Sequence, residues 1–285
     1  MTTDKAPRRP LLALTRPKQW VKNGFVLAPL VFAGAFRDRR AIADTLVTMV
    51  FFCIASAATY VLNDLLDAPR DREHPTKHYT RPIAAGRVTP ARARWLLAVL
   101  YAVLIAGLAV EPRPLVAVWG YVVLNVLYTL WLKHMPVVDL FAIAGSFVLR
   151  VFAGGLALQA PVSSWMFITT LSLALYLAAV KRRQELESNG SGARAVLERY
   201  SLKLLDTYAQ VAAVGAIIFY SLFATTVRPA LVSTIPFVLF GLFRYWYITE
   251  QSGQGESPTD AVWTDWPLAV TVLAWAGLCL LAVWH

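Results

Sequence analysis

The sequence predicts an all-α integral membrane protein that crosses the bilayer many times. Of its 285 residues, 58% are hydrophobic and only 15% are charged, and the mean hydropathy is +0.54. These values differ strongly from those of soluble globular domains. Since open strands cannot satisfy their backbone groups in lipid, each apolar stretch of spanning length is expected to form a helix.

Nine apolar stretches are long enough to be predicted as transmembrane helices, and the whole chain, residues 1–285, is expected to form one polytopic domain. A hydrocarbon core of about 30 Å requires roughly 20 helical residues. The first stretch is short and begins with polar residues, so its boundaries are the least well defined. The predicted spans cover about residues 20–36, 42–66, 92–110, 114–132, 137–158, 163–181, 207–227, 231–249 and 265–284.

The basic character of the chain indicates membrane topology rather than nucleic-acid binding, because the cations lie mainly between spans. With a cytoplasmic N-terminus, the cytoplasmic segments carry 21 of the 27 Lys and Arg residues. Two long charged loops, about 67–91 and 182–206, then lie on the cytoplasmic side, where we expect them to cap an active site. The exception is an arginine cluster at residues 37, 39 and 40, which this orientation places outside.

Four polar residues at the end of the second span form the most informative motif. On a helix, Asn63, Asp67 and Asp71 lie about 100°, 60° and 20° behind Asp64, so all four share one stripe. Acidic groups at membrane depth cost on the order of 3 kcal/mol each, which indicates a functional site. Their oxygens suit Mg²⁺. The alternative is a solvated helix end whose carboxylates pair with nearby arginines.

Cations follow the acidic stripe directly. Lys77 and Arg81 are candidates to bind phosphate oxygens beside a metal. Pro69 lies within the stripe and removes a backbone donor, so we expect Asp71 to approach the site from a loop rather than from the helix.

The second long loop opens with charges of the opposite sign. Lys181, Arg182 and Glu185 fall within about 100° of arc on a helix, so they can face one cavity, whereas Arg183 points elsewhere. These residues alone are equally compatible with a basic stop signal whose side chains extend to the membrane surface.

Several further residues are candidates for binding a substrate. Lys18 and Lys22, at the cytoplasmic end of the first span, fit either a lipid phosphate or anchoring to anionic lipids. Tyr128 and Lys133, near the end of the fourth span, are weaker candidates.

Arg150 lies inside the fifth predicted span, where a guanidinium must face a cavity or a partner. We expect it to face the cavity. Asp139 shares its helical face but lies roughly 16 Å away along the axis, too far for direct pairing.

The motifs together resemble the UbiA-type intramembrane transferase superfamily over essentially the whole chain. The resemblance rests on Asn63-Asp64-x-x-Asp67-x-x-x-Asp71, on the nine spans, and on the opening segment Thr15-Arg16-Pro17-Lys18-Gln19-Trp20-Val21-Lys22-Asn23. It implies helices around a central cavity that is open laterally to lipid. It also implies that the acidic motif binds a magnesium diphosphate.

This chain lacks the second acidic motif of the members that prenylate aromatic acceptors, and carries Lys181-Arg182-x-x-Glu185-Leu186 instead. It thereby resembles the decaprenyl-phosphate phosphoribosyltransferases, as do the segments Arg70-Asp71-Arg72-Glu73-His74-Pro75-Thr76-Lys77 and Arg81-Pro82-Ile83-Ala84-Ala85-Gly86. The resemblance implies transfer of 5-phosphoribosyl from 5-phosphoribosyl 1-diphosphate to a polyprenyl phosphate for arabinan and cell-wall synthesis. It further implies Mg²⁺ as cofactor and a bacterial inner membrane with a cytoplasmic active site.

The expected roles follow from that reaction. Asp64 and Asp67, supported by Asn63 and Asp71, hold Mg²⁺ on the diphosphate, and the phosphates contact a cationic set comprising Lys77, Arg81, Lys181 and Arg182. Glu185 orients a cation or contacts a ribose hydroxyl. Two alternatives stay open: a UbiA-type prenyltransferase with an aromatic acceptor, and a lipid-phosphate transporter. Nucleic acid is not an expected partner, and association into a homo-oligomer is left open.

Overall fold

The computed structural model describes residues 10–73, 77–189, 196–252, 261 and 264–284, and all regular structure in these ranges is helical. Eight helical segments are long and apolar enough to cross a membrane, which confirms the all-α membrane fold. They are α3 (Arg39–Glu73), α5 (Pro90–Gly107), α6 (Pro112–Leu130), α7 (Val138–Ala157), α8 (Ser164–Asn189), α9 (Leu202–Thr226), α10 (Ile235–Ser252) with the preceding η6 (Pro229–Thr234), and α12 (Trp266–Trp284).

The predicted first span is not one continuous helix, so the count of nine is not confirmed. After α1 (Pro10–Leu14), the chain forms the 3-10 helix η1 (Pro17–Leu27), the short helix α2 (Ala28–Phe32) and the 3-10 turn η2 (Ala35–Arg37). The apolar composition of a span is present, but Gly24 and Pro29 interrupt it, and Gly34 ends α2 with a φ of +74°. Glycine and proline both disfavour a regular α-helix when they lie in its interior.

Two helices extend further into the charged loops than predicted. α3 continues through Pro69 to Glu73, so the prediction that Asp71 approaches from a loop is wrong. Proline removes one backbone hydrogen bond near the helix end, and Asp67 and Asp71 make ion pairs with Lys133 and Arg81 from this part of the helix. α8 likewise continues to Asn189.

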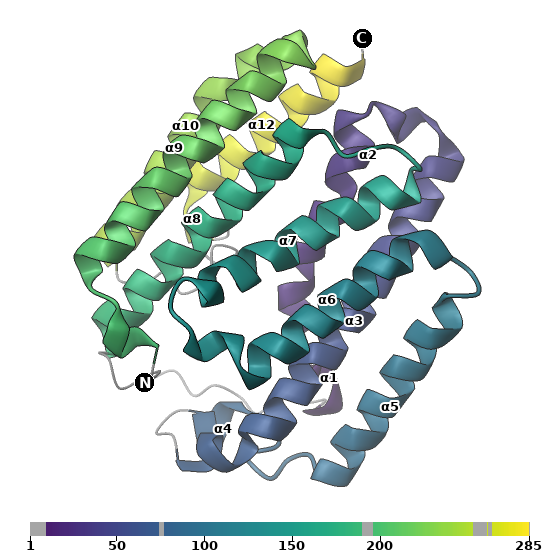
Figure 1. Cartoon of the computed structure of the whole chain (residues 1–285), viewed down its shortest axis with the longest axis vertical. Coiled ribbons are helices and arrows are strands. Elements are labelled where there is room, and N and C mark those ends of the chain that lie inside the picture. The colour runs from purple at the N-terminus through teal and green to yellow at the C-terminus, as the bar shows by residue number, and fades with distance from the viewer. Residues whose placement is uncertain (1–9, 74–76, 190–195, 253–260, 262–263, 285) are drawn as a thin grey trace.

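α7 lies at the centre of the bundle. It contacts α3, α6, α8 and η1, while α9 packs along α8, and α10 contacts α12; Figure 1 shows this arrangement. η1 approaches α7 closely at Gly154, where a Cβ atom would stand 2.1 Å from the carbonyl oxygen of Val26. The absence of a side chain at this position therefore sets the distance between the first segment and the central helix.

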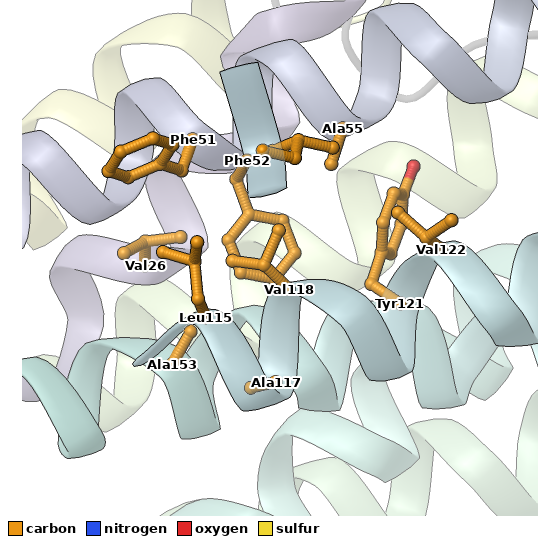
Figure 2. Close-up of a cluster of buried hydrophobic side chains, with 11 residues drawn as sticks. Val26, Phe51, Phe52, Ala55, Leu115, Ala117, Val118, Tyr121, Val122 and Ala153 are labelled. Carbon is orange, nitrogen blue, oxygen red and sulfur yellow. The ribbon is translucent and has the colours of Figure 1, made fainter. Parts of the chain in front are cut away.

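A cluster of buried apolar side chains joins α3, α6, α7 and η1 (Figure 2). Phe52 and Tyr121 lie edge to face with ring centroids 5.4 Å apart, and Val118 is fully buried between the helices. Since lipid is as apolar as these side chains, close packing rather than transfer from water stabilises the cluster.

Arg37, from the cluster that the predicted topology places outside, and Arg228 both bind helix ends. Arg37 donates to the carbonyl oxygen of Trp284 at 2.6 Å, and its guanidinium lies 4.4 Å from that indole ring. Arg228 donates to the carbonyl oxygens of Phe32 and Ala33 at 3.2 and 3.0 Å. Cations are stabilised at the C-terminal ends of helices, so at least Arg37 and Arg228 have structural reasons to lie at this end of the bundle.

Candidate active site

A cavity of about 810 Å³ lies between the helices, lined by side chains from η1, α3, α6, α7, α8 and α12. Val21 of η1 and Leu273 of α12 belong to its wall and are also 52% and 72% exposed. The cavity therefore reaches the apolar surface of the bundle between these two elements. This agrees with the expected cavity that is open laterally to lipid.

The wall of the cavity carries more cations than carboxylates. In the part of the chain that the structure describes, seven Lys and Arg residues line it, against two carboxylates. The cations are Arg16, Lys22, Arg70, Arg81, Lys133, Lys181 and Arg182, and the carboxylates are Asp67 and Asp71. A polyanion is the ligand that such a wall favours.

The acidic stripe forms as predicted and is held by cations from three other segments. Asp64 is 2% exposed, and its Oδ1 binds both Arg16 and Nη1 of Arg81, the latter at 2.8 Å. Nε of Arg81 lies 4.0 Å from Oδ2 of Asp71. Nζ of Lys133 lies 3.3 Å from Oδ1 of Asp67. These contacts join the acidic motif to the residue before η1, to the segment after α3 and to the 3-10 turn η3 (Leu132–His134) that follows α6.

Arg16 is a site residue that sequence reasoning did not assign. It precedes Pro17 and has a left-handed backbone with a φ of 48°, a conformation that costs on the order of 1–3 kcal/mol. Its guanidinium lies 4.8 Å from the ring centroid of Tyr60, and it binds Asp64. The contact joins residues far apart in sequence. The signal that could have assigned Arg16 to the site is therefore its place in the opening motif of the family resemblance.

The oxygen donors of the stripe fit a magnesium ion that is completed by its substrate. Asn63, Asp67 and Asp71 line the cavity, and Oδ2 of the buried Asp64 has no hydrogen-bond partner in the described part of the chain. No group of three His, Cys, Asp or Glu residues among the described residues forms a ready metal cage. Mg²⁺ commonly uses one or two carboxylates, with water and substrate phosphates supplying the other ligands, so a complete cage is not required.

The second motif is built around a buried arginine. The Arg182 side chain is 1% exposed; its Nε binds Oδ2 of Asp139 at 2.8 Å, its Nη1 binds Oε2 of Glu185 at 2.6 Å, and its Nη2 donates to the hydroxyl of Tyr128 at 2.6 Å. Lys181 lines the cavity beside it. Arg182 therefore uses three of its N–H donors to bind protein groups. It lines the cavity and also holds neighbouring side chains in position.

Arg183 points away from this motif, as the helical projection predicted. It pairs with Glu187, Asp206 and Glu250 at 2.8, 2.6 and 2.7 Å. These three carboxylates come from α8, α9 and α10, so Arg183 ties together the ends of three helices.

Arg150 does not line the cavity, contrary to expectation. Its Nε donates to Oδ1 of Asn23 at 2.9 Å, its Nη1 donates to the carbonyl oxygen of Ser146 at 2.7 Å, and it lies 4.6 Å from the ring centroid of Tyr121. Phe147, which does line the cavity, stands beside it. Arg150 thus fixes η1 to α7 from behind the cavity wall.

The remaining candidates divide between the cavity and other places. Lys22, Tyr128 and Lys133 line the cavity, whereas Lys18 is exposed and does not belong to its wall. The side chain of Lys77 lies outside the described residues. Sequence reasoning also did not assign Arg70 or five polar wall residues that no charge pattern marks: Thr59, Tyr60, Asn125, Thr129 and His134.

A polytopic helical bundle whose cavity holds carboxylates and cations beside lipid has the architecture of an intramembrane transferase. The model described as the UbiA prenyltransferase family matches residues 25–264, and the chain belongs to that family. Similar proteins named decaprenyl-phosphate phosphoribosyltransferase occur in Corynebacterium glutamicum (35% identical, covering 96% of this chain and 86% of the relative) and in Mycolicibacterium smegmatis (33%, covering 94% and 90%). The relative of that name in Mycobacterium tuberculosis strain H37Rv is 32% identical, covering 91% and 89%.

Solved structures show the same fold. A UbiA homolog from Archaeoglobus fulgidus bound to DMAPP and Mg²⁺ has a TM-score of 0.72 at 18% identity, covering 96% of this chain and 99% of that one. The same homolog bound to GPP and Mg²⁺ gives the same values. At this identity the likeness concerns the fold alone.

Proposed function

We propose that this protein transfers 5-phosphoribosyl from 5-phosphoribosyl 1-diphosphate to a polyprenyl phosphate and releases diphosphate. The excess of cations in the cavity wall carries the proposal. A prenyl diphosphate brings one diphosphate to the site, whereas the proposed pair brings a diphosphate, a 5-phosphate and a lipid phosphate. The named activity of the relatives in Corynebacterium glutamicum and the mycobacteria supports this assignment.

The acidic stripe is proposed to receive the diphosphate end of the sugar. Asp67, Asp71 and the amide of Asn63 face the cavity, and Asp64 is anchored behind them by two arginines. A magnesium ion bound at these oxygens would neutralise the diphosphate and stabilise it as a leaving group. Arg81 lies at the same place and can contact a phosphate oxygen while it retains Asp64.

Four further cations of the cavity wall are proposed to hold the two other phosphates. Lys181 and Arg182 come from α8, Lys133 from the 3-10 turn after α6, and Lys22 from η1 beside the lateral opening. Because Lys22 shares that wall with Val21, it can bind a phosphate whose polyprenyl chain extends into lipid. The lipid phosphate is anionic at neutral pH, so its attack on the anomeric carbon needs positioning and electrostatic stabilisation rather than a strong general base.

The site is proposed to lie on the cytoplasmic side of a bacterial inner membrane, within one polytopic domain. The distribution of Lys and Arg supports this orientation. The segments at about 67–91 and 182–206 then cap the cavity, and the water-soluble sugar enters from the cytoplasm. Arabinan and cell-wall precursor synthesis is the process that the product would serve.

The test is to incubate purified protein in lipid with phosphoribosyl diphosphate labelled in the ribose, polyprenyl phosphate and Mg²⁺. Label is expected to enter the lipid phase, and diphosphate is expected to appear in equal amount. Reaction of a prenyl diphosphate with an aromatic acceptor, without label transfer from the sugar, would instead support a prenyltransferase. Movement of the lipid across vesicles without bond cleavage would support a transporter.

A further inference from the structure

A chain of hydrogen bonds connects the segment before α9 to the cavity wall. The hydroxyl of Tyr200 donates to Oδ1 of Asp139 at 2.8 Å, and Oδ2 of the same carboxylate accepts from Nε of Arg182 at 2.8 Å. Nη2 of Arg182 then donates to the hydroxyl oxygen of Tyr128 at 2.6 Å. Four residues from four segments are therefore linked, and Tyr128, at the end of the series, lines the cavity.

The direction of these bonds determines what Tyr128 presents to the cavity. Arginine has donors but no acceptor, so the oxygen of Tyr128 accepts from Arg182 and its own hydrogen remains available to another acceptor. Tyr128 thus offers the cavity a neutral donor of fixed direction, a group suited to a phosphate or sugar oxygen.

Two carboxylates hold the guanidinium that fixes Tyr128: Asp139 binds its Nε and Glu185 binds its Nη1. Asp139 is fully buried, and the Arg182 side chain is 1% exposed. Two buried ions are stabilised only when their geometry and remaining hydrogen bonds are satisfied. Oδ1 of Asp139 has such a bond from Tyr200, which stops the carboxylate from rotating.

Tyr200 is itself held at a strained point of the backbone. Its oxygen accepts from the N–H of Val137 at 2.6 Å, and Val137 has a φ of +67°, which β-branched residues rarely adopt. Burial raises the pKa of Tyr200, and its hydrogen bond to Asp139 raises it further. The hydroxyl therefore stays protonated at neutral pH and continues to donate to the carboxylate.

We propose that Asp139 and Tyr200 are positioning residues that act through Arg182 to orient the hydroxyl of Tyr128 toward an oxygen of the substrate. The inference rests on the proposed function, and it assigns roles to two residues that never contact the substrate. Of the residues in this hydrogen-bond series, Tyr128 is the one proposed to donate to the substrate oxygen. Arg182 and Asp139 transmit the position of Tyr200 to Tyr128.

The experiment is a double-mutant cycle measured as the rate of label transfer to lipid. Tyr128→Phe removes the donor and is expected to lower kcat by roughly 100-fold, the order found for one lost transition-state donor. Tyr200→Phe is expected to lower kcat by about 10-fold, as for loss of a supporting hydrogen bond. In the double variant, Tyr200→Phe is expected to have almost no further effect, because the hydroxyl that it orients is gone.

Controls separate this role from a structural one. Tyr208 packs against the same hydrophobic cluster as Tyr200, and Tyr208→Phe is expected to leave kcat unchanged. A structural role would instead give the same loss with or without Tyr128, together with a lower thermal midpoint.

The outcomes are distinct. Equal losses from Tyr200→Phe in both backgrounds, in a wild-type protein that labels the lipid, would overturn the positioning role and leave the proposed function standing. A wild-type protein that transfers no label, beside an active relative as control, would overturn both. A fall in kcat caused by Tyr200→Phe only when Tyr128 is present supports the inference.

Discussion

Replacing Gly154 with alanine is expected to displace the first segment of the protein. An added Cβ would stand 2.1 Å from the carbonyl oxygen of Val26 and 3.1 Å from the ring of Pro29. Contacts of a Cβ below 3.0 Å are essentially absent from real proteins, so η1 must retreat from α7 by about 1 Å. η1 carries Lys22 and Phe25 on the cavity wall, and these side chains move with it.

The expected losses follow from that displacement. Overpacking of this kind destabilises by about 1–3 kcal/mol, and a misplacement of about 1 Å at a site can lower the rate by about 100-fold. We therefore expect Gly154→Ala to lower the thermal midpoint in detergent and to reduce kcat/KM for phosphoribosyl transfer by roughly 10- to 100-fold.

A matched control lies on the same segment. Gly24→Ala places its Cβ in open space, with no atom within 4 Å, and is expected to retain stability and activity. Wild-type values for both quantities in Gly154→Ala would refute the argument that this close approach sets the position of η1.

Three further predictions concern charge. Asp67→Asn is expected to lower transfer by roughly 100-fold with almost no change in thermal midpoint, because its pair with Lys133 is partly exposed and such pairs contribute about 0–1 kcal/mol; a large fall in the midpoint would contradict this. Removal of divalent cations with EDTA is expected to abolish transfer, and added Mg²⁺ to restore it, so full activity in EDTA would argue against a metal at the stripe. The hydrogen bond from Arg244 holds the pKa of Asp265 below its usual range, so the stabilisation is present at neutral pH and is lost as the pH falls below about 3.9 through the lowered pKa. Thermal midpoints of wild type and Asp265→Asn should therefore differ at pH 7 and converge as the pH falls through the lowered pKa of Asp265.

The acidic stripe could be predicted because it depends on one helix. The 3.6-residue period places Asp64, Asp67 and Asp71 on one face, and α3 has this regular form. The partners could not be predicted in the same way. Arg16 binds Asp64 across 48 residues of sequence, and such a contact depends on how separate segments pack.

The same limit explains Arg150 and Asp139. Both were correctly placed inside or at the end of one helix, and the argument that they are too far apart to pair agrees with the structure. Their partners come from elsewhere: Asn23 binds Arg150, and Arg182 binds Asp139. A helical projection gives the face of a residue but not the element that covers that face.

The first segment shows the corresponding limit for secondary structure. Its apolar composition predicts a span, and the structure forms η1 and α2 instead. A buried hydrogen bond from Arg150 to Asn23 and the close approach at Gly154 fix this conformation. Since both contacts are tertiary, local propensity could not reveal them.

Among the described residues, seven cations line the cavity, against Asp67 and Asp71 in the wall and Asp64, Asp139 and Glu185 bound to wall arginines, so a surplus of positive charge remains for anionic ligands to neutralise. Like charges confined beside low-dielectric walls repel each other, and an anion that enters relieves this repulsion and stabilises the native state by mass action. The anionic substrates thus act as counterions for the cations of the cavity wall. Anionic lipids are accordingly expected to remain bound to the protein through detergent extraction. Diphosphate in the buffer is expected to slow the loss of native protein after purification.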